Sequence, residues 1–521
     1  MRRTALGLTL ALVLISACSD DPSPTSVSSG QIDLGSTSGP HDSSDTTDSS
    51  DTTLATTVAT IDPDGDPFDW QDFGTDTPVQ TGHLTVPIDY ENPSLGTFDL
   101  FVARHLADPD QRIGSLLVNP GGPGFGGSDF AIYAEQIYTS DLLERFDIVG
   151  WDPRGTGLTE PFIDCTDDYD HFFTGTDITP DDDAERQQII DLAAEFAEAC
   201  AHNSGEILSH VGTNNSARDM NSIREALGEE KISYFGFSYG SELGATWATM
   251  FPDTVRAAVL DGASDPSAGY VESGLQQAAG FENTLATFLA GCSNDPDCAF
   301  HNDGDAEGAF DELMNSLDEE PIPSVEGRPD VTRGVALAGV AQAMYSQGYW
   351  PMLEIALSNA QYGDGEGLLE LFDSYYQRRD DGTYDNSLEA FQVIYCMDDE
   401  ERLTVEEDDA TAPDFQRVAP RFSPGTTGTY FCTFFPVSTD PRMEITGEGA
   451  GPILVMGTTG DPATPLSSTE SMAEALEDGR LVVVTADQHT GYGVNQCSED
   501  VVDRYLIDPV ANAPADGTVC D

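Results

Sequence analysis

The stretch that decides the fold reads Ile232-Ser233-Tyr234-Phe235-Gly236-Phe237-Ser238-Tyr239-Gly240. Its first half is a short apolar run typical of a buried strand, and the amphipathic segment 241–250 that follows favours a helix. The pattern Gly-x-Ser-x-Gly therefore lies at a strand-to-helix turn, which is the context of a nucleophile elbow. Such a turn strains the backbone of the serine, and the two flanking glycines remove side chains that would collide there. We predict that Ser238 is a catalytic nucleophile.

Further strand-like runs alternate with helical segments along the chain, which predicts a mostly parallel sheet with helices on both faces, an α/β fold. The other expected strands are 83–88, 97–104, 115–119, 146–151, 257–260, 453–456 and 481–484. Between residues 267 and 448 the periodicity is helical and strand-like runs are few. Because this interval is too long for a connection, we expect a helical cap inserted over the carboxyl ends of the strands, where open α/β sheets bind ligands.

A serine nucleophile needs a base, and the chain has 8 histidines. In the fold that the elbow indicates, the α/β-hydrolase fold, the acid and then the histidine follow the serine along the chain. His489 directly follows the last expected strand, whereas His301 falls in the cap and the other histidines precede Ser238. The acid should follow the preceding strand, which favours Asp461 over its competitor Asp487 on the histidine's own loop. We expect Asp461 to orient the imidazole, which takes the serine proton.

A glycine-rich loop, Asn119-Pro120-Gly121-Gly122-Pro123-Gly124, follows an early expected strand. Glycine lets a backbone N–H approach a substrate carbonyl oxygen closely, so we predict an oxyanion hole made by the N–H groups of Gly122 and Tyr239. A phosphate-binding loop is the alternative. The loop lacks the following Lys-Ser/Thr and the G-x-G-x-x-G spacing that phosphate binding would favour.

The N-terminus predicts export and a lipid anchor. Met1-Arg2-Arg3 precedes a short apolar run and then Ile15-Ser16-Ala17-Cys18, which resembles a bacterial lipobox. The run is too short to span a bilayer, so we expect residues 1–17 to be a lipoprotein signal peptide and Cys18 to be acylated; an ordinary signal peptide is the alternative. Residues 18–60 hold hardly a large apolar side chain and are expected to be a disordered tether. The predicted location is extracytoplasmic, lipid-anchored to a bacterial cell membrane.

Of the 9 cysteines, 8 remain after Cys18, an even number in a chain bound for an oxidising compartment. Four disulfides between sequence neighbours close short loops and are favoured among the pairings that stay open: Cys165–Cys200, Cys292–Cys298, Cys396–Cys432 and Cys497–Cys520. Neither a CxxC nor a Cys/His spacing indicates a metal, and no cofactor is expected.

The charge balance bears on partners. Asp and Glu number 93 against 21 Lys and Arg. This excess repels nucleic acid and anionic lipid headgroups. It is typical either of a solubility bias or of adaptation to high salt, where screening relieves the repulsion.

Several motifs together resemble the tripeptidyl aminopeptidase branch of the proline iminopeptidase-like serine peptidases. Besides the elbow and the glycine-rich loop, they are Trp151-Asp152-Pro153-Arg154-Gly155-Thr156-Gly157, Leu260-Asp261-Gly262, Gly460-Asp461-Pro462-Ala463-Thr464-Pro465 and the closing Val502-Asp503-Arg504-Tyr505-Leu506. The chain departs from the family at Thr81-Gly82-His83-Leu84, where a cysteine is missing, and at Gln488-His489-Thr490-Gly491, where Gly-His-Gly is more usual. We divide the chain into core segments 61–266 and 449–521 around the cap 267–448.

The resemblance implies an extracellular exopeptidase that removes short peptides or single residues from free N-termini, often beside apolar or proline residues. Recognition of a peptide's terminal ammonium calls for buried carboxylates, and the sequence offers Glu272, Glu282, Glu354 and Glu370 without choosing among them. A carboxylic-ester hydrolase has the same triad chemistry and is the close alternative; a non-catalytic binding lipoprotein is a third. The sequence fixes neither the length of the released peptide nor the oligomeric state.

Overall fold

One mixed sheet runs through the structure, a computed structural model that describes residues 65–521 except 76, 175–177, 181 and 380. The strand order in this part of the chain is β1-β2-β3-β5-β4-β6-β7-β8-β9-β10. Neighbours from β1 to β5 pair antiparallel, and neighbours from β5 to β10 pair parallel. The strands are β1 Gln71–Asp72, β2 Val79–Pro87, β3 Thr97–His105, β4 Gly114–Asn119, β5 Phe146–Trp151, β6 Ile232–Phe237, β7 Val255–Asp261, β8 Ile453–Thr458, β9 Gly479–Val484 and β10 Thr518–Cys520.

Helices cover both faces of the sheet, which explains why the central strands β4, β5, β6 and β8 are buried along their whole length. One face packs against α5, α6 and α16. The other packs against α1, α2, α3 and α17. These helices are α1 Ser128–Ile132, α2 Ala134–Ile137, α3 Ser140–Arg145, α5 Thr213–Ala226, α6 Tyr239–Met250, α16 Leu466–Ala475 and α17 Gln496–Ile507. The α/β class with a mostly parallel sheet is confirmed.

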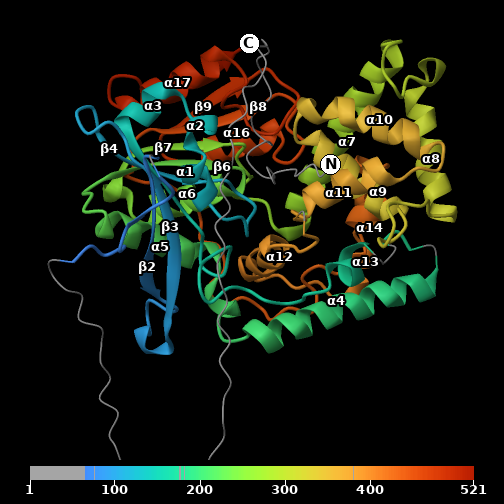
Figure 1. Cartoon of the computed structure of the whole chain (residues 1–521), viewed down its shortest axis with the longest axis horizontal. Helices are drawn as coiled ribbons and strands as arrows, with labels where there is room; N and C mark the ends of the chain where they lie inside the picture. Colours follow the sequence, from blue (N-terminus) through green and yellow to red (C-terminus); the bar gives the residue numbers. More distant parts are fainter. Residues whose placement is uncertain (1–64, 76, 175–177, 181, 380) are drawn as a thin grey trace, which may run out of the picture. The chain divides into compact units, whose positions relative to one another are not determined.

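The chain between β7 and β8 is helical, and Figure 1 shows most of these helices gathered beside the sheet rather than on its faces. Five of them, α7 to α11, build a hydrophobic core of their own together with α14. The helices of this cap are α7 Tyr270–Asn294, α8 Ala306–Glu319, α9 Arg333–Met344, α10 Trp350–Ala360, α11 Glu366–Tyr375, α12 Ser387–Met397, α13 Val405–Asp409, α14 Ala412–Val418 and α15 Ser423–Thr426. A second hydrophobic core is what an insertion of this length needs to be stable.

A second helical segment, which the sequence patterns did not predict, lies between β5 and β6. Its long helix α4 (Asp183–Ser204) runs beside α12 and α13 in Figure 1. The Arg186 guanidinium on α4 pairs with the Asp409 carboxylate at the end of α13, and the disulfide Cys165–Cys200 closes the segment. The cap therefore packs against two separate parts of the chain.

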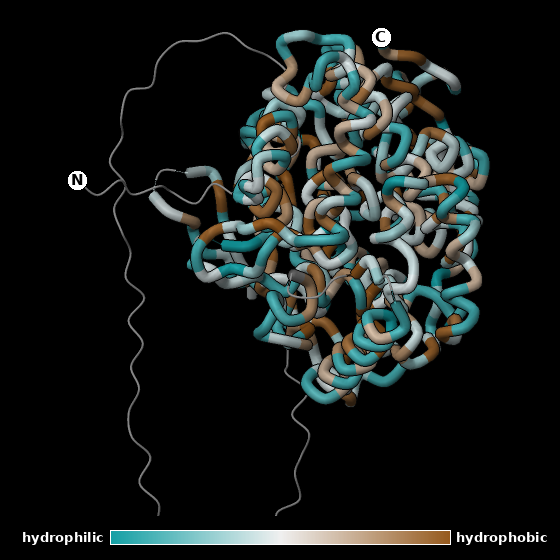
Figure 2. The backbone as a smooth tube through the Cα atoms, turned by 90° about the vertical axis from the view of Figure 1, so that its right-hand side faces the viewer, coloured by the Kyte–Doolittle hydropathy of each residue, from teal (hydrophilic) through white to brown (hydrophobic). Residues whose placement is uncertain are grey.

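The structure pairs the eight cysteines of the described region as the four neighbouring pairs favoured from the sequence. Along the backbone, hydrophilic stretches lie mostly at the outline and hydrophobic stretches inside (Figure 2). Within the residues described, no helix has the length and apolar character needed to cross a membrane. The expected signal peptide, the lipidated Cys18 and the tether fall outside those residues.

Candidate active site

Ser238 lies in a strained backbone turn between β6 and α6. Its φ is 55° and its ψ is −126°, a conformation that residues other than glycine rarely adopt. Two glycines make the turn possible: a Cβ atom on Gly236 would lie 2.2 Å from the carbonyl oxygen of Gly240, and a Cβ atom on Gly240 would lie 2.9 Å from that of Asn119. Ser238 is half-buried and lines a cavity, so a ligand in that cavity can reach it.

The imidazole of His489 is bonded to the carboxylate of Asp461. Its Nδ1 lies 2.8 Å from Asp461 Oδ1 and 2.9 Å from Oδ2. The carboxylate also accepts backbone N–H bonds from Ala463 at 3.0 Å, Thr464 at 2.8 Å and Thr490 at 3.2 Å. These bonds hold the acid in place, so that Nδ1 carries the proton and Nε2 is the basic nitrogen. Asp461 follows β8 and His489 follows β9, so the structure brings together the two residues chosen from the sequence.

The competing acid lies elsewhere: Asp487 accepts a hydrogen bond from Gln347 Nε2 at 3.4 Å.

Burial lowers the pKa of His489, but the charge and hydrogen bond of Asp461, with the charge of Asp261, outweigh burial and raise that pKa above its usual value. His489 Nε2 is buried and has no hydrogen-bond partner among the described residues. An imidazole with its Nδ1 bonded to a carboxylate and its Nε2 unbonded has the arrangement that a general base needs.

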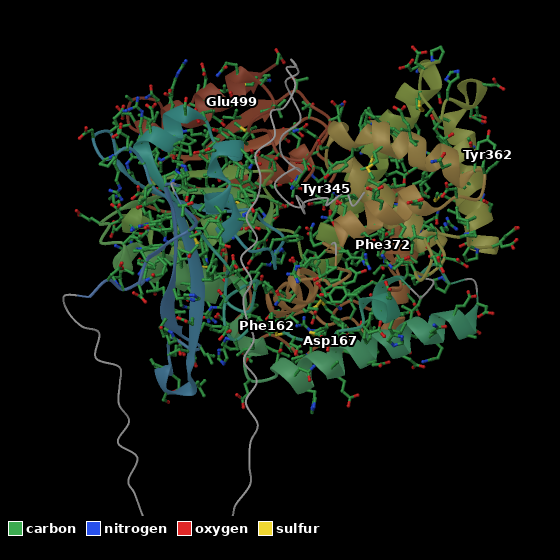
Figure 3. All side chains as sticks on the ribbon, in the orientation of Figure 1. Phe162, Asp167, Tyr345, Tyr362, Phe372 and Glu499 are labelled. Atoms are coloured by element: carbon green, nitrogen blue, oxygen red, sulfur yellow. A yellow bond between two sulfur atoms is a disulfide. The ribbon has the colours of Figure 1, made fainter. Side chains whose placement is uncertain are left out.

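The histidine loop also contacts the cap. The backbone N–H of His489 donates to the carbonyl oxygen of Tyr345 at 2.9 Å, and the two rings meet edge to face with centroids 5.5 Å apart. Tyr345, labelled in Figure 3, lies where the cap helices meet the C-terminal part of the core. The cap therefore helps to hold the backbone and the ring of His489 in place.

The glycine-rich loop after β4 packs directly against the nucleophile turn. A Cβ atom on Gly121 would lie 2.8 Å from the Cβ of Ser238 and 2.6 Å from the carbonyl oxygen of Phe237. The N–H of Gly121 donates to Asn119 Oδ1 at 3.0 Å, so it is already used. Gly122 lines the same cavity as Ser238 and Tyr239. The two residues predicted to form an oxyanion hole, Gly122 and Tyr239, therefore line the same cavity as Ser238.

The cavity has a volume of about 510 Å³ and lies between the core loops and the cap. Five carboxylic side chains and a single guanidinium are among its described lining residues, so its wall carries an excess of negative charge. They are Glu242, Asp265, Asp398, Asp399, Asp408 and Arg442. Such a wall attracts a cation and disfavours an anionic ligand.

Asp398, which follows α12, is the most deeply buried of these acids. Its Oδ1 accepts the backbone N–H of Thr213 at 2.7 Å, and its Oδ2 accepts the Thr213 hydroxyl at 2.6 Å. The same hydroxyl is bonded to the phenol of Tyr239, the residue after the nucleophile. Burial, with the nearby charge of Glu242, raises the pKa of Asp398 to about 7. The sequence contained no signal that Asp398 lines this cavity, apart from the neighbouring disulfide cysteine Cys396.

Glu242 is one helical turn after the nucleophile. Its Oε1 lies 3.1 Å from Arg442 Nη1, and its Oε2 accepts the Ser264 hydroxyl at 3.3 Å. Arg442 also lies 3.8 Å from Asp399. One guanidinium thus pairs with two carboxylates, and its charge also acts on Asp398, whose pKa it lowers against the stronger effect of burial.

The glutamates considered from the sequence do not line the cavity. Glu282 is buried but accepts the backbone N–H groups of Arg421 at 2.9 Å and Phe422 at 3.3 Å. Glu354 accepts a backbone N–H on the outer part of the cap at 3.2 Å. Glu272 and Glu370 are exposed. Their helical positions could be predicted, but the direction in which each side chain points could not.

Apolar side chains, many of them aromatic, make up much of the rest of the cavity wall, beside several Ser, Thr and Gln side chains. Its aromatic members include Phe172, Phe173, Phe196, Phe281, Phe415 and Phe422. The first three come from the unexpected segment between β5 and β6, where the ring centroids of Phe172 and Phe196 are 5.4 Å apart. The cavity wall thus combines acidic side chains with a large aromatic surface.

Comparison with known proteins identifies the family of the chain. A family model described as alpha/beta hydrolase fold matches residues 114–496. Serine protease Hip1 of Mycobacterium tuberculosis is 34% identical over 486 residues, 88% of this chain and 91% of that protein. Carboxylesterase B of the same species is 34% identical over 440 residues, 82% and 83% of the two chains.

Two further proteins extend the comparison. Tripeptidyl aminopeptidase of Streptomyces coelicolor is 29% identical over 459 residues, 84% of each chain. A solved structure, proline iminopeptidase from Mycobacterium smegmatis, covers 82% of this chain and 98% of its own at 14% identity, with a TM-score of 0.33 that is too low to support an inference. On the family model and the relatives at 34% identity, the chain belongs to the alpha/beta hydrolase family.

Proposed function

We propose that the protein is a secreted serine peptidase of the tripeptidyl aminopeptidase type, which removes peptides from free N-termini. The relatives named serine protease and tripeptidyl aminopeptidase support peptide hydrolysis. The observation that supports an aminopeptidase in particular is the cavity, which Ser238 lines together with Asp398 and Glu242. An anionic wall beside the nucleophile suits a substrate with a positive charge near the scissile bond.

The catalytic cycle follows from the triad. His489 takes the proton of Ser238 as its hydroxyl attacks the substrate carbonyl, and Asp461 stabilises the imidazolium that forms. The N–H groups of Gly122 and Tyr239 stabilise the oxyanion. His489 then donates its proton to the leaving amine, which leaves an acyl-enzyme, and a water activated by the same base releases the peptide acid.

We assign recognition of the substrate ammonium to Asp398, with Glu242 beside it. Each oxygen of Asp398 accepts one hydrogen bond from Thr213 and keeps a lone pair for a further donor. Arg442, the one cation that acts on this acid among the lining residues described, forms its ion pairs with Glu242 and Asp399, so an entering ammonium adds the positive charge that is missing directly beside Asp398. Because the pKa of Asp398 is raised to about 7, binding a cation also favours its ionised form.

The aromatic wall suits apolar substrate side chains beyond the terminal residue. The wall presents the large flat rings of Phe172, Phe173 and Phe422. Covering these rings with apolar groups is favourable, because it removes apolar surface from water. These rings offer no ionic partner for an acidic side chain, and the excess of acids in the same wall disfavours one. We therefore expect preference for apolar over acidic residues in the released peptide.

The test compares two fluorogenic substrates of one sequence: a tripeptidyl amide with a free ammonium and its N-acetylated form. The proposal predicts cleavage of the first substrate at least tenfold faster than of the second in kcat/KM. Ser238→Ala should abolish both activities. Equal cleavage of the free and acetylated amides would contradict an exopeptidase.

A carboxylic-ester hydrolase is the second candidate, and the relative named carboxylesterase B favours it. Short-chain nitrophenyl esters separate the two functions, because turnover of esters without turnover of amides would support the esterase. A binding lipoprotein without catalysis is the third candidate. It would be supported if a fluorophosphonate probe failed to label Ser238.

We also propose that the mature protein begins at an acylated Cys18 and is held outside the cytoplasm on a bacterial membrane. The lipobox-like Ile15-Ser16-Ala17-Cys18 supports this. Mass spectrometry of the N-terminal peptide should find a diacylglyceryl cysteine. Cys18→Ser should move the protein from the detergent phase to the aqueous phase, and an unmodified Cys18 in the wild type would contradict the proposal.

A further inference from the structure

Asp261, the last residue of β7, is a buried acid that contacts two of the catalytic loops. Its carbonyl oxygen accepts the backbone N–H of Ser238 at 2.7 Å. Its side-chain oxygens each accept one backbone N–H from the histidine loop, from Gly491 at 2.8 Å and from Tyr492 at 2.8 Å. The residue is fully buried. A single residue therefore joins the nucleophile turn to the loop that carries the base.

The next residue, Gly262, extends this contact to the third catalytic element. Its N–H donates at 2.8 Å to the carbonyl oxygen of Met456 in β8, the strand that leads to Asp461. Its φ is +69°, and a Cβ atom there would lie 2.9 Å from Cε1 of His489. The end of β7 thus packs against His489 and bonds the strand that leads to Asp461.

The histidine loop needs such a support. Thr490, directly after His489, has a φ of 66°, which is unfavourable for a β-branched residue and persists only where the surroundings fix it. The two N–H groups held by Asp261 belong to the next two residues. Without that carboxylate, two buried donors would lose their partner beside an already strained residue.

We infer that Asp261 is a positioning residue for catalysis, which sets the imidazole of His489 against Ser238 through the backbone of Gly491 and Tyr492. The inference rests on the triad proposed above. It holds for a peptidase and for an esterase alike, because the residue touches neither substrate nor reacting atoms.

Asp261 also acts on the base through its charge. The groups that face His489 are Asp461 from the loop after β8, Asp261 from the end of β7, and the phenol of Tyr345 from the end of α9. Burial raises the pKa of Tyr345 well above its usual value, so that phenol stays neutral. Burial raises the pKa of Asp261 itself to about 7, although the N–H bonds from Gly491 and Tyr492 favour its ionised form. When Asp261 is ionised, its charge favours the imidazolium of His489. Removing this charge should lower the pKa of the base.

The test is Asp261→Asn, which keeps the shape of the side chain and one acceptor but places an NH₂ donor against the second N–H. A misplacement of the base on the ångström scale lowers the rate by about 10²-fold. We expect kcat to fall by about that factor with KM unchanged within twofold. The acid limb of the kcat/KM profile should move to lower pH, a shift that a merely structural role would not produce.

Asp147→Asn is the matched control. This buried aspartate accepts the Ala107 N–H at 2.9 Å and pairs with Arg112 at 2.7 Å, at the amino end of β5, the opposite end of the sheet from the triad. It should lower the melting temperature without changing kcat or the acid limb. If Asp261→Asn does not accumulate as folded protein, Asp261→Ser keeps one acceptor in a smaller side chain and is measured instead.

Two results would overturn the inference: a kcat within threefold of the wild type, or a loss of kcat with an unmoved acid limb. The triad itself is tested separately. His489→Ala that retained full activity would refute the triad, whereas an inactive His489→Ala beside a fully active Asp261→Asn would refute only the positioning role.

Discussion

Replacing Asp398 by asparagine tests how the substrate is recognised. The change keeps an acceptor for Thr213 but removes the carboxylate offered to a substrate ammonium. A hydrogen bond that involves a charged group contributes about 1.5–3 kcal/mol, and each 1.36 kcal/mol is tenfold in rate. The predicted loss of kcat/KM is therefore about 10- to 100-fold for a tripeptidyl amide with a free N-terminus.

The loss should be specific to the ammonium. The N-acetylated substrate has no charge to lose, so Asp398→Asn should leave its slow cleavage unchanged within twofold. Steady-state kinetics on both amides give the two ratios. Glu282→Gln is the control, because this buried acid lies outside the cavity and bonds backbone N–H groups of the cap instead. An equal loss on both substrates, or no loss on either, would refute the assignment.

Three further predictions concern the triad, the elbow and stability. His489 must be neutral to act as the base, and Asp461 raises its pKa, so activity should fall below that pKa. Asp461→Asn should move the acid limb of kcat/KM to lower pH and reduce kcat by about 10⁴-fold. An unmoved limb would contradict this. Gly236→Ala places a Cβ atom 2.2 Å from the Gly240 carbonyl and should lower the free energy of unfolding by about 1–3 kcal/mol in urea titration, with loss of activity; a fully stable variant would show that the turn is not constrained. The pKa of Asp398 is raised from 3.8 to about 7 in the folded protein, so its ionisation lowers stability as pH rises through that window. The melting temperature of Asp398→Asn relative to wild type should accordingly be higher at pH 8 than at pH 5, and a difference of the opposite sign would refute the shift.

Much of the sheet could be predicted because buried parallel strands leave a plain mark in the sequence. Runs such as 146–151 and 453–456 are apolar on both faces, since helices cover both faces of the sheet. The edge strands β1 and β10 are short and carry no such run. They form only because a neighbouring strand is already in place, which a local pattern does not reveal.

The triad could be chosen by order along the chain, because the fold fixes where each member follows its strand. His489 and Asp461 meet at 2.8 Å, as that order implies. The carboxylate of Asp261 could not be given a role in the same way. Its partners are backbone N–H groups more than 200 residues away, and such groups have no signature in the sequence.

The cavity wall was the least predictable part. Glutamates on cap helices were reasonable candidates by position, yet the acids that line the cavity include Glu242 on a core helix and Asp398 just after α12, and none of those glutamates. Which helix face turns toward the nucleophile depends on how the cap packs on the core. The segment that holds Phe172 and Phe196 reaches the cavity for the same reason, through tertiary contacts rather than local propensity.

One measurement tests the central claim most directly: incubation of the protein with an unblocked peptide of about ten residues and its N-acetylated twin, followed by mass spectrometry of the products. A serine peptidase that acts on free N-termini should release short fragments that carry the original N-terminus from the unblocked peptide alone, and none from either peptide with Ser238→Ala. Internal fragments, equal cleavage of the acetylated twin, or products that persist in Ser238→Ala would contradict it.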